Sequence, residues 1–311
     1  MSDNVAESGS SKKKQYCIIA GAPRCGTTSL YQYLSDHPQI CPSFVKQTNY
    51  FLDPDYEGVA SQPISKTDGY SDLFDSKDKH LYNLEATPDY LYSPNSALSI
   101  SSMLGENVNL IFILRHPVEQ FISLHKHYKR VGMINVESDI DEFIVAELKK
   151  AETDEAVLLK KGCYHLHLEK YYHLFPRDKI QILYTELLSE NPLKVMEELE
   201  VSLDIKRGFY TDYAFVSKNT ATEVRSRTIL QLYQKLRLRA ISLTQNNKIL
   251  RILFIPARKL VSQIYKSLNN SRSTGVDISE SSRAMLLAFY QEEFEKLEEL
   301  VGIPNPWRHM Q

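Results

Sequence analysis

The sequence predicts an α/β fold with three layers, in which helices cover both faces of a central parallel sheet. Short apolar segments with strand composition alternate along the chain with segments whose apolar residues recur at helical spacing. Strands that alternate with helices form parallel sheets that are buried on both faces. A loop bracketed by Gly21 and Gly26 joins the first strand to the first helix, and such loops commonly bind phosphate.

The predicted elements follow one another in strand–helix order. Strands are expected over residues 16–20, 81–84, 108–114 and 180–184, and the almost wholly apolar segment 108–114 is the clearest buried strand. Helices are expected from residue 30 and over 94–104, 118–125, 141–159 and 164–174, where Pro117 suits a first helical turn. An acidic last helix ends before Gly302 and Pro304. Residues 53–76, rich in Gly, Pro, Asp and Ser, form a predicted long loop.

The composition favours one domain over residues 15–311, preceded by a disordered tail over residues 1–14 that is polar and ends in three lysines. Residues 224–276 contain eleven lysines and arginines and no acid, which predicts a basic, helical, lid-like segment. The net charge of −2 gives no basic signature for nucleic acid. Neither a zinc spacing among the four cysteines nor an apolar run long enough to cross a bilayer is present. We expect a cytoplasmic protein with free thiols.

The loop from Gly21 to Ser29 is P-loop-like. The glycine separation matches the nucleotide-triphosphate pattern G-x-x-x-x-G-K-[ST], but Thr27 stands where the lysine belongs, and the loop's cation is Arg24. The buried strand 108–114 ends in Arg115, where a triphosphatase has an aspartate that holds magnesium. These residues predict an anionic nucleotide that is bound by protein cations and requires no metal.

Two motifs resemble those of the sulfotransferase superfamily. The segment Pro23 to Leu30 resembles its phosphosulfate-binding loop, and Arg115-His116-Pro117 with Ser123 resembles its motif for the other phosphate of the nucleotide. Weaker resemblances are found at residues 85–90, at 162–168, and at Asn219 with 225–227. The resemblance implies phosphoadenosine phosphosulfate (PAPS) as the sulfate donor and adenosine 3′,5′-bisphosphate (PAP) as its product.

The resemblance also implies roles for individual residues. Arg24 would contact the bridging oxygen between phosphate and sulfate, where charge develops during transfer. The 5′ phosphate would lie on the loop formed by Cys25, Gly26, Thr27, Thr28 and Ser29. Arg115 and Ser123 would bind the 3′ phosphate, and Arg225 and Arg227 belong to the late segment that closes on the nucleotide.

The catalytic base is where this chain departs from the carbohydrate branch of the family. That branch has Lys-Glu-x-x-x-Phe and uses the glutamate as its base, whereas this chain has Lys46-Gln47 at the same place, and an amide accepts no proton at neutral pH. Glu85, expected just past a strand end, is the first substitute, although a structural carboxylate is equally consistent with its position. His125 and His127 are the next candidates. Lys46 is expected to contact the sulfate.

The sequence therefore predicts a sulfotransferase that moves a sulfuryl group from PAPS to a hydroxyl, or less favourably an amine, of a small-molecule, sugar or lipid acceptor. A bacterial enzyme acting on a small metabolite, a glycolipid or a sugar is the natural fit. Two alternatives stay open: a catalytically impaired protein that binds PAP or PAPS, and a small-molecule kinase. Residues 224–276 also have three interpretations, namely a lid over the cofactor or acceptor, a peripheral membrane contact, or a solvated face.

Overall fold

The computed structural model describes residues 14–56, 69–131, 133–135, 137–216, 222–224, 270–272 and 278–309. Its centre is a five-stranded sheet of β1 (Gln15–Gly21), β2 (Ile40–Pro42), β3 (Tyr82–Ala86), β4 (Val108–Leu114) and β5 (Ile180–Tyr184). The strands are in the order β2-β3-β1-β4-β5 and all pair in parallel. The parallel sheet predicted from the alternating pattern is confirmed.

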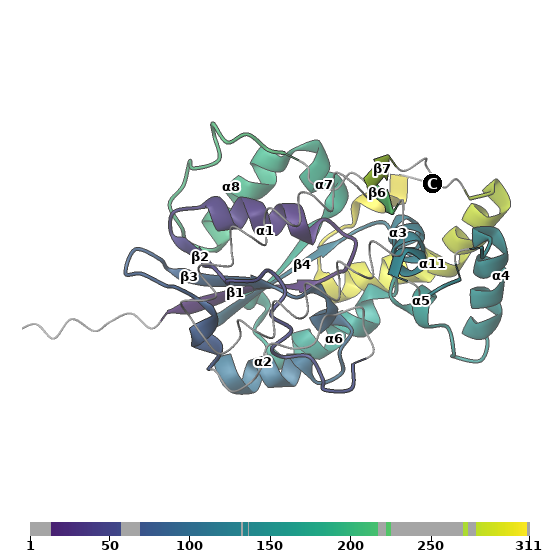
Figure 1. The fold of residues 1–311 in the computed structure, drawn as a ribbon, viewed down its shortest axis with the longest axis horizontal. Helices are drawn as coiled ribbons and strands as arrows, with labels where there is room; N and C mark the ends of the chain where they lie inside the picture. Colours follow the sequence, from purple (N-terminus) through teal and green to yellow (C-terminus); the bar gives the residue numbers. More distant parts are fainter. Residues whose placement is uncertain are drawn as a thin grey trace, which may run out of the picture.

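The apolar strands form the core because helices cover them on both sides. Every residue of β4 is buried, as are the last five residues of β1, which lies in the middle of the sheet. Figure 1 shows α1 (Thr27–Asp36), α7 (Thr185–Glu190) and α8 (Pro192–Ser202) on one face, with α2 (Ser96–Leu104) and α6 (Tyr164–Leu174) on the other. Because the strands are parallel, the loops that follow β1, β3, β4 and β5 all leave from the same edge of the sheet.

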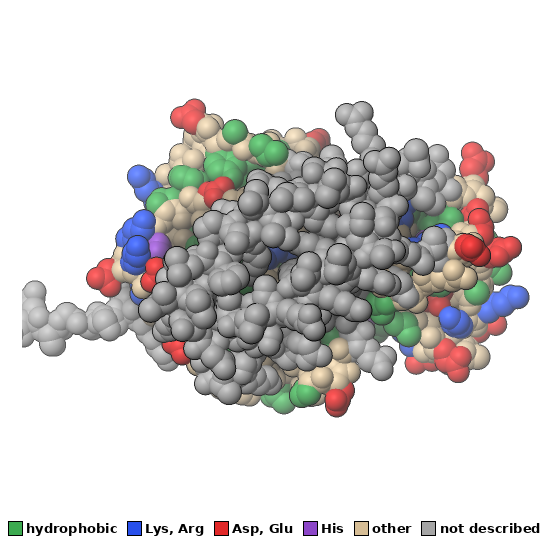
Figure 2. Space-filling model, in the orientation of Figure 1, with side chains coloured by type: hydrophobic (Ala, Val, Ile, Leu, Met, Phe, Trp, Pro, Cys, Tyr) green, Lys and Arg blue, Asp and Glu red, His purple; other side chains and the backbone are tan. Residues whose placement is uncertain are grey.

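The other α-helices in the described part of the chain lie beyond that edge. They are α3 (Pro117–Val131), α4 (Ile140–Ala151), α5 (Val157–Lys160) and the long α11 (Glu280–Val301) (Figure 1). A short antiparallel pair joins β6 (Thr222–Val224) to β7 (Asn270–Arg272). Figure 2 shows acidic side chains gathered at the end of the molecule where α4 lies. Among the described helices, none is both long and apolar enough to span a membrane.

The single helix predicted over residues 141–159 is wrong, because the chain forms two helices there. α4 ends at Ala151, where the Lys150 carbonyl accepts from the amides of Thr153 and Glu155 and Asp154 takes a left-handed conformation with φ of 63°. That conformation stops a helix. Strand β2 and helices α7 and α8 were not predicted.

Candidate functional site

The loop between β1 and α1 leaves the first turn of α1 open to a ligand. Gly26 caps the helix with a left-handed φ of 91°, a conformation that favours glycine. In the described structure no side chain caps α1, and its first turn carries no acid. The first amides of a helix have no intrahelical acceptor and sit at the positive end of its dipole. This turn is therefore built to receive an anion, as the sequence predicts.

Two cations meet at this loop, Arg24 from the loop itself and Lys46 from another part of the chain. The Arg24 Nε donates to Ser123 Oγ on α3 at 3.1 Å, so the first predicted motif contacts the second. The Lys46 Nζ, from the loop after β2, donates to Thr28 Oγ1 at 2.9 Å and lies 3.4 Å from Thr27 Oγ1. Lys46 thus places an ammonium group beside the residue that occupies the lysine position of a P-loop.

The pKa values show that these cations are crowded together. Burial, and then the charge of Arg24, lowers the pKa of Lys46 to about 8. The pKa of Arg24 is lowered by burial and then by Arg130 and Arg115. Four positive side chains from three segments therefore repel one another around the loop, an arrangement that an anion with several charges relieves.

Two residues of the second predicted motif, Arg115 and His116, line a pocket of about 360 Å³ at the end of β4, whereas Ser123 of the same motif binds Arg24. The Arg115 Nη2 lies 3.7 Å from Glu119 Oε2, and the other oxygen of Glu119 binds Arg283 Nη1 of α11 at 2.9 Å. The pocket is lined by Arg115, His116, Glu119, Thr185, Glu186, Ser189 and Arg283. Arg130, Thr185 and Arg283 were not singled out in the sequence. Thr185 directly follows β5, and the rule that ligands bind at the carboxyl ends of parallel strands could have identified it from the sequence.

Two hydroxyl groups tie the loops after β1 and β4 together. The Tyr164 hydroxyl donates to the Arg115 carbonyl at 2.8 Å and lies 3.6 Å from Cys25 Sγ. The Thr185 hydroxyl donates to the Cys25 carbonyl at 2.6 Å and lies 2.8 Å from the Leu114 carbonyl. The two motifs are thus held in a fixed relation by neighbouring elements.

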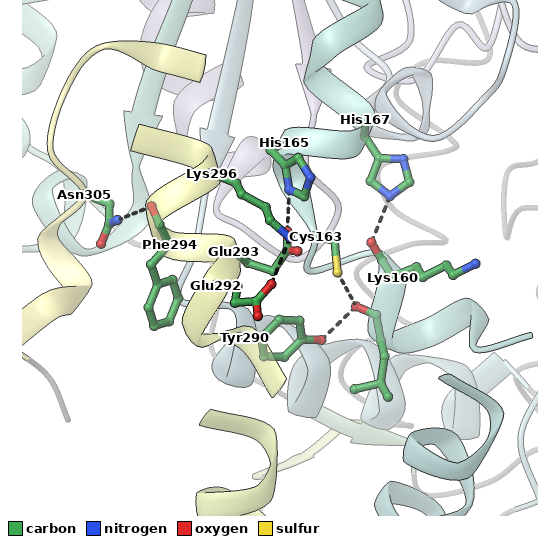
Figure 3. Close-up of polar contacts among 11 residues, drawn as sticks. Lys160, Cys163, His165, His167, Tyr290, Glu292, Glu293, Phe294, Lys296 and Asn305 are labelled. Carbon is green, nitrogen blue, oxygen red and sulfur yellow. Dashed lines mark hydrogen bonds and ion pairs between the residues drawn. The ribbon is translucent and has the colours of Figure 1, made fainter. Parts of the chain in front are cut away.

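The turn that carries Tyr164 is in turn fixed by α11. The Tyr290 hydroxyl donates to the Leu159 carbonyl at 2.8 Å, and His165 Nδ1 lies 2.5 Å from Glu293 Oε2 (Figure 3). A Cβ at Gly162 would lie 2.7 Å from the Tyr290 hydroxyl, so this close approach requires glycine. In the Gly162-Cys163-Tyr164 segment, the close approach of Tyr290 therefore explains the glycine, and the hydrogen bond to the Arg115 carbonyl explains the tyrosine.

Cys25 takes part in the loop through its backbone. Its side chain is fully buried, and burial raises the pKa of the thiol to about 12. The thiol is therefore protonated and unreactive at neutral pH.

The position predicted for Glu85 is wrong. Glu85 lies within β3 and is 0% exposed, whereas the sequence placed it past the strand end. Its carboxylate accepts hydrogen bonds from four hydroxyl groups: Thr48 at 2.5 Å, Tyr90 at 2.9 Å, and Tyr70 and Thr87 at 3.0 Å. A base must touch the proton it removes, and this carboxylate is sealed inside the fold. The geometry supports the structural interpretation, in which Glu85 holds the loops after β2 and β3.

The two histidines proposed as bases have different surroundings. His127 lies near Arg24, and its Nδ1 accepts from Arg130 Nη2 at 2.7 Å, because a guanidinium only donates. Burial, Arg130 and Arg24 lower the pKa of His127 to about 3, so the ring is neutral and its lone pair is occupied. His127 in this arrangement is a hydrogen-bond donor through Nε2. His125 is buried, and its ring centroid lies 4.9 Å from that of Phe143.

Other predicted features bear on what the site binds. Gln47 is exposed, and its amide accepts no proton at neutral pH, as expected from the sequence. Within the described part of the chain, no group of three His, Cys, Asp or Glu side chains is placed to hold a metal ion. Arg225 and Arg227, with most of the basic segment 224–276 and residues 1–13 of the predicted tail, lie outside the described residues.

Comparison with known proteins adds to this geometry. The family described as "Sulfotransferase domain" matches residues 14–251. Heparan sulfate glucosamine 3-O-sulfotransferase 3B1 of Mus musculus is 26% identical over 215 residues, which cover 68% of this chain and 51% of the relative. Membrane-associated sulfotransferase kil1 of Dictyostelium discoideum is 23% identical over 275 residues, covering 63% and 57%. The chain thus spans little more than half the length of these curated relatives.

A solved structure shares the fold. The crystal structure of a sulfotransferase from Alicyclobacillus acidocaldarius superposes with a TM-score of 0.64, at 19% identity, over 96% of this chain and all of the other. At this identity the match shows the architecture alone.

Proposed function

Because the chain belongs to the sulfotransferase family, we propose that it transfers a sulfuryl group from PAPS to a hydroxyl group of a carbohydrate. The family uses PAPS as its donor, and the donor supplies the sulfuryl group and leaves as PAP. The observation that carries the proposal is the crowding of Arg24, Lys46, Arg115 and Arg130 around the open first turn of α1. A bisphosphorylated nucleotide with a sulfate is an anion that suits this arrangement.

Different residues of this chain would bind different parts of the nucleotide. The amides and hydroxyls of Gly26, Thr27 and Thr28 would hold the 5′ phosphate, and Arg115 with Ser123 would hold the 3′ phosphate. Arg24, which is part of this loop, and Lys46, which donates to Thr28, would stabilise the charge that develops on the bridging oxygen. His127 would donate to an oxygen of the same anion through Nε2.

The acceptor class rests on the relatives. Heparan sulfate glucosamine 3-O-sulfotransferase 3B1 acts on a glucosamine of heparan sulfate, as its name says, which supports a sugar hydroxyl, with a sugar amine as the less favoured acceptor. A small molecule or a lipid remains compatible with the residues described here.

The experiment combines binding with product analysis. Calorimetric titration with PAP and with ATP–magnesium, followed by incubation with PAPS and a heparan-type oligosaccharide and mass spectrometry, is expected to show PAP binding and a sulfated product. Arg24→Ala is expected to lower turnover by about 10²-fold or more with the fold intact, because a cation at developing charge contributes at this level. Tight ATP–magnesium binding without PAP binding would indicate a kinase instead.

A second candidate is a protein that binds PAP without transferring sulfate. Three observations favour it: Gln47 is an amide, Glu85 is sealed, and the lone pair of His127 is occupied by Arg130. PAP binding with no sulfated product from alcohol, sugar, phenol or amine acceptors would establish this alternative.

A further inference from the structure

A group that removes the acceptor's proton has to meet three conditions. It must be an ionisable acceptor with a free oxygen or nitrogen, it must be partly accessible, and it must lie on the same side of the sheet as Arg24. Gln47 is not ionisable and Glu85 is fully buried. The ring nitrogen of His127 that could accept a proton is bound by Arg130. Asp89, two residues beyond the Thr87 that binds Glu85, was not among the candidates from the sequence.

Asp89 sits in the short 3-10 helix Pro88–Leu91, which follows β3 at the edge where the loops converge. The residue is partly exposed, and its Oδ1 accepts from the Tyr56 hydroxyl at 2.9 Å. Lys161 is the cation whose charge favours the ionised form of Asp89, and it is itself 8% exposed. Asp89 therefore combines a carboxylate and a neighbouring cation in a residue that is partly exposed.

A chain of contacts connects Lys161, whose charge acts on this carboxylate, to the loop that carries Arg24. The Lys161 Nζ lies 3.8 Å from the ring centroid of Tyr92, and the Tyr92 hydroxyl donates to the Lys161 carbonyl at 2.8 Å. Gln120 Nε2 donates both to the Tyr92 hydroxyl at 2.9 Å and to the Pro23 carbonyl at 3.2 Å. Pro23 directly precedes Arg24, so Asp89 and the cationic loop are built into one packed unit.

Packing contacts and hydrogen bonds hold the segments around Asp89. The Lys161 ammonium group packs against the Tyr92 ring. The turn from Leu159 to Cys163, which carries Lys161, is held against α11 by the Tyr290 hydroxyl (Figure 3). On the α3 side, Tyr128 is close enough to Asp89 for the carboxylate charge to raise the tyrosine's pKa. Tyr128 directly follows His127 in α3, so Asp89 lies near the part of α3 that carries this histidine.

We propose that Asp89 is the catalytic base, in the role that the carbohydrate branch gives to the glutamate replaced here by Gln47. This inference rests on the proposed function. The Asp89 carboxylate takes the proton of the acceptor hydroxyl while the acceptor oxygen forms its bond to sulfur. The bond between sulfur and the bridging oxygen breaks, its electron pair leaves with PAP, and Asp89 later releases the proton to solvent.

The groups that face Asp89 set the pH range in which it works. Burial raises the pKa of Asp89, whereas Lys161 and the hydrogen bond from Tyr56 lower it. Tyr92 and Tyr128 also face the carboxylate, and their own pKa values are raised, so both stay neutral. A base works in its ionised form, so transfer to an alcohol is expected to fall as the pH drops through the pKa of Asp89.

The test uses two acceptors with the full chain and PAPS. A heparan-type oligosaccharide offers hydroxyls that must lose a proton, whereas 4-nitrophenol is largely ionised at pH 8. Asp89→Asn is expected to lower kcat for the oligosaccharide by about 10²–10⁴-fold, to leave transfer to 4-nitrophenol near the wild-type rate, and to leave the Kd for PAP unchanged. Retained 4-nitrophenol transfer also shows that the variant folds.

A readout independent of turnover is the titration of the Asp89 carboxyl carbon by ¹³C NMR, assigned by its loss in Asp89→Asn. Lys161→Met is expected to raise that pKa by about one to three units and to move the acid limb of the pH–rate profile by the same amount. Asp36→Asn is the matched control, because Asp36 also accepts from a tyrosine, Tyr213, at 2.6 Å. Asp36→Asn is expected to change neither the titration of the Asp89 carboxyl carbon nor the pH–rate profile.

The outcomes separate the two proposals. Equal oligosaccharide turnover in Asp89→Asn and wild type overturns the assignment of Asp89 alone, as does an equal loss with both acceptors. Product from none of the acceptors, in wild type that binds PAP, overturns both the proposed transfer and the base.

Discussion

Lys46 shows how a missing residue can be replaced from elsewhere in the chain. The loop after β1 has Thr27 where a P-loop has lysine, and the ammonium group of Lys46 binds the hydroxyl of Thr28 beside it. The sequence predicted that Lys46 contacts the sulfate but not that it contacts this loop, because nineteen residues separate the two and no local pattern links them. A cation delivered by another loop can be placed only by the fold.

The pKa of Lys46 predicts a pH dependence for nucleotide binding. In the free protein the pKa is about 8, and a bound anion raises it, so binding takes up a proton between the two values. The affinity for PAP is therefore expected to fall by up to about tenfold per pH unit above pH 8. Calorimetric titration from pH 7 to pH 9.5 measures this slope. Lys46→Met should bind more weakly throughout and lose the slope; a variant that keeps it would show that another group titrates.

Glu85 gives a prediction that separates a structural carboxylate from a base. Glu85→Gln replaces an acceptor of four hydroxyl donors by an amide that offers N–H groups to some of them. We expect a loss of about 1–3 kcal/mol in the free energy of unfolding and a nearly unchanged kcat per folded molecule. Urea unfolding and active-site titration measure the two quantities. A stable variant with lost turnover would restore Glu85 as the base.

At the scale of elements, the site depends on contacts between loops that follow different strands. Tyr164 donates to the Arg115 carbonyl and approaches Cys25, so α6 holds the loops after β1 and β4 together. Tyr164→Phe keeps the ring and removes the hydroxyl. We expect the Kd for PAP to rise about tenfold, because both phosphate-binding loops lose a common anchor, and the free energy of unfolding to fall by about 1–2 kcal/mol.

The control for that change is Tyr172→Phe, on the same helix, where Arg177 packs 4.9 Å from the ring. Calorimetry on both variants is the measurement. Equal effects of the two substitutions on PAP binding would show that Tyr164 does not set the position of the loops.

Elements with strong local signals were predictable, and those defined by packing were not. The apolar run of β4 and the glycine loop before α1 predicted two strands and the start of the first helix correctly. The break after α4 depends on the left-handed Asp154, and the three residues of β2 are strand because they pair with β3. The position of Arg283 on α11 beside Arg115 joins residues far apart in sequence, so no pattern in either segment revealed it.

At the scale of the whole molecule, the net charge of −2 conceals the charge of the site. Cations gather at the edge of the sheet where β1 and β4 end, while acidic side chains gather over the end that carries α4 (Figure 2). We therefore expect long-range electrostatic attraction to contribute to nucleotide binding, and salt screens this attraction.

We therefore expect the Kd for PAP to rise with ionic strength, by about an order of magnitude or more between 50 and 500 mM salt, because several charges are paired in the complex. Titrations in sodium chloride measure this dependence, with sodium acetate as a check on specific anions. The loss of Lys46 should reduce the dependence on salt. An affinity that is independent of salt would show that the cations do not contact the nucleotide.

The most direct test of the account is whether a single nucleotide spans both motifs. Wild type and Arg115→Ala are titrated calorimetrically with PAP and with adenosine 5′-monophosphate, which lacks the 3′ phosphate. Wild type is expected to prefer PAP by about 10²-fold, and Arg115→Ala to lose at least tenfold of that preference while binding the monophosphate as before. An unchanged preference for PAP in Arg115→Ala would contradict the account, since the 3′ phosphate would then lie elsewhere.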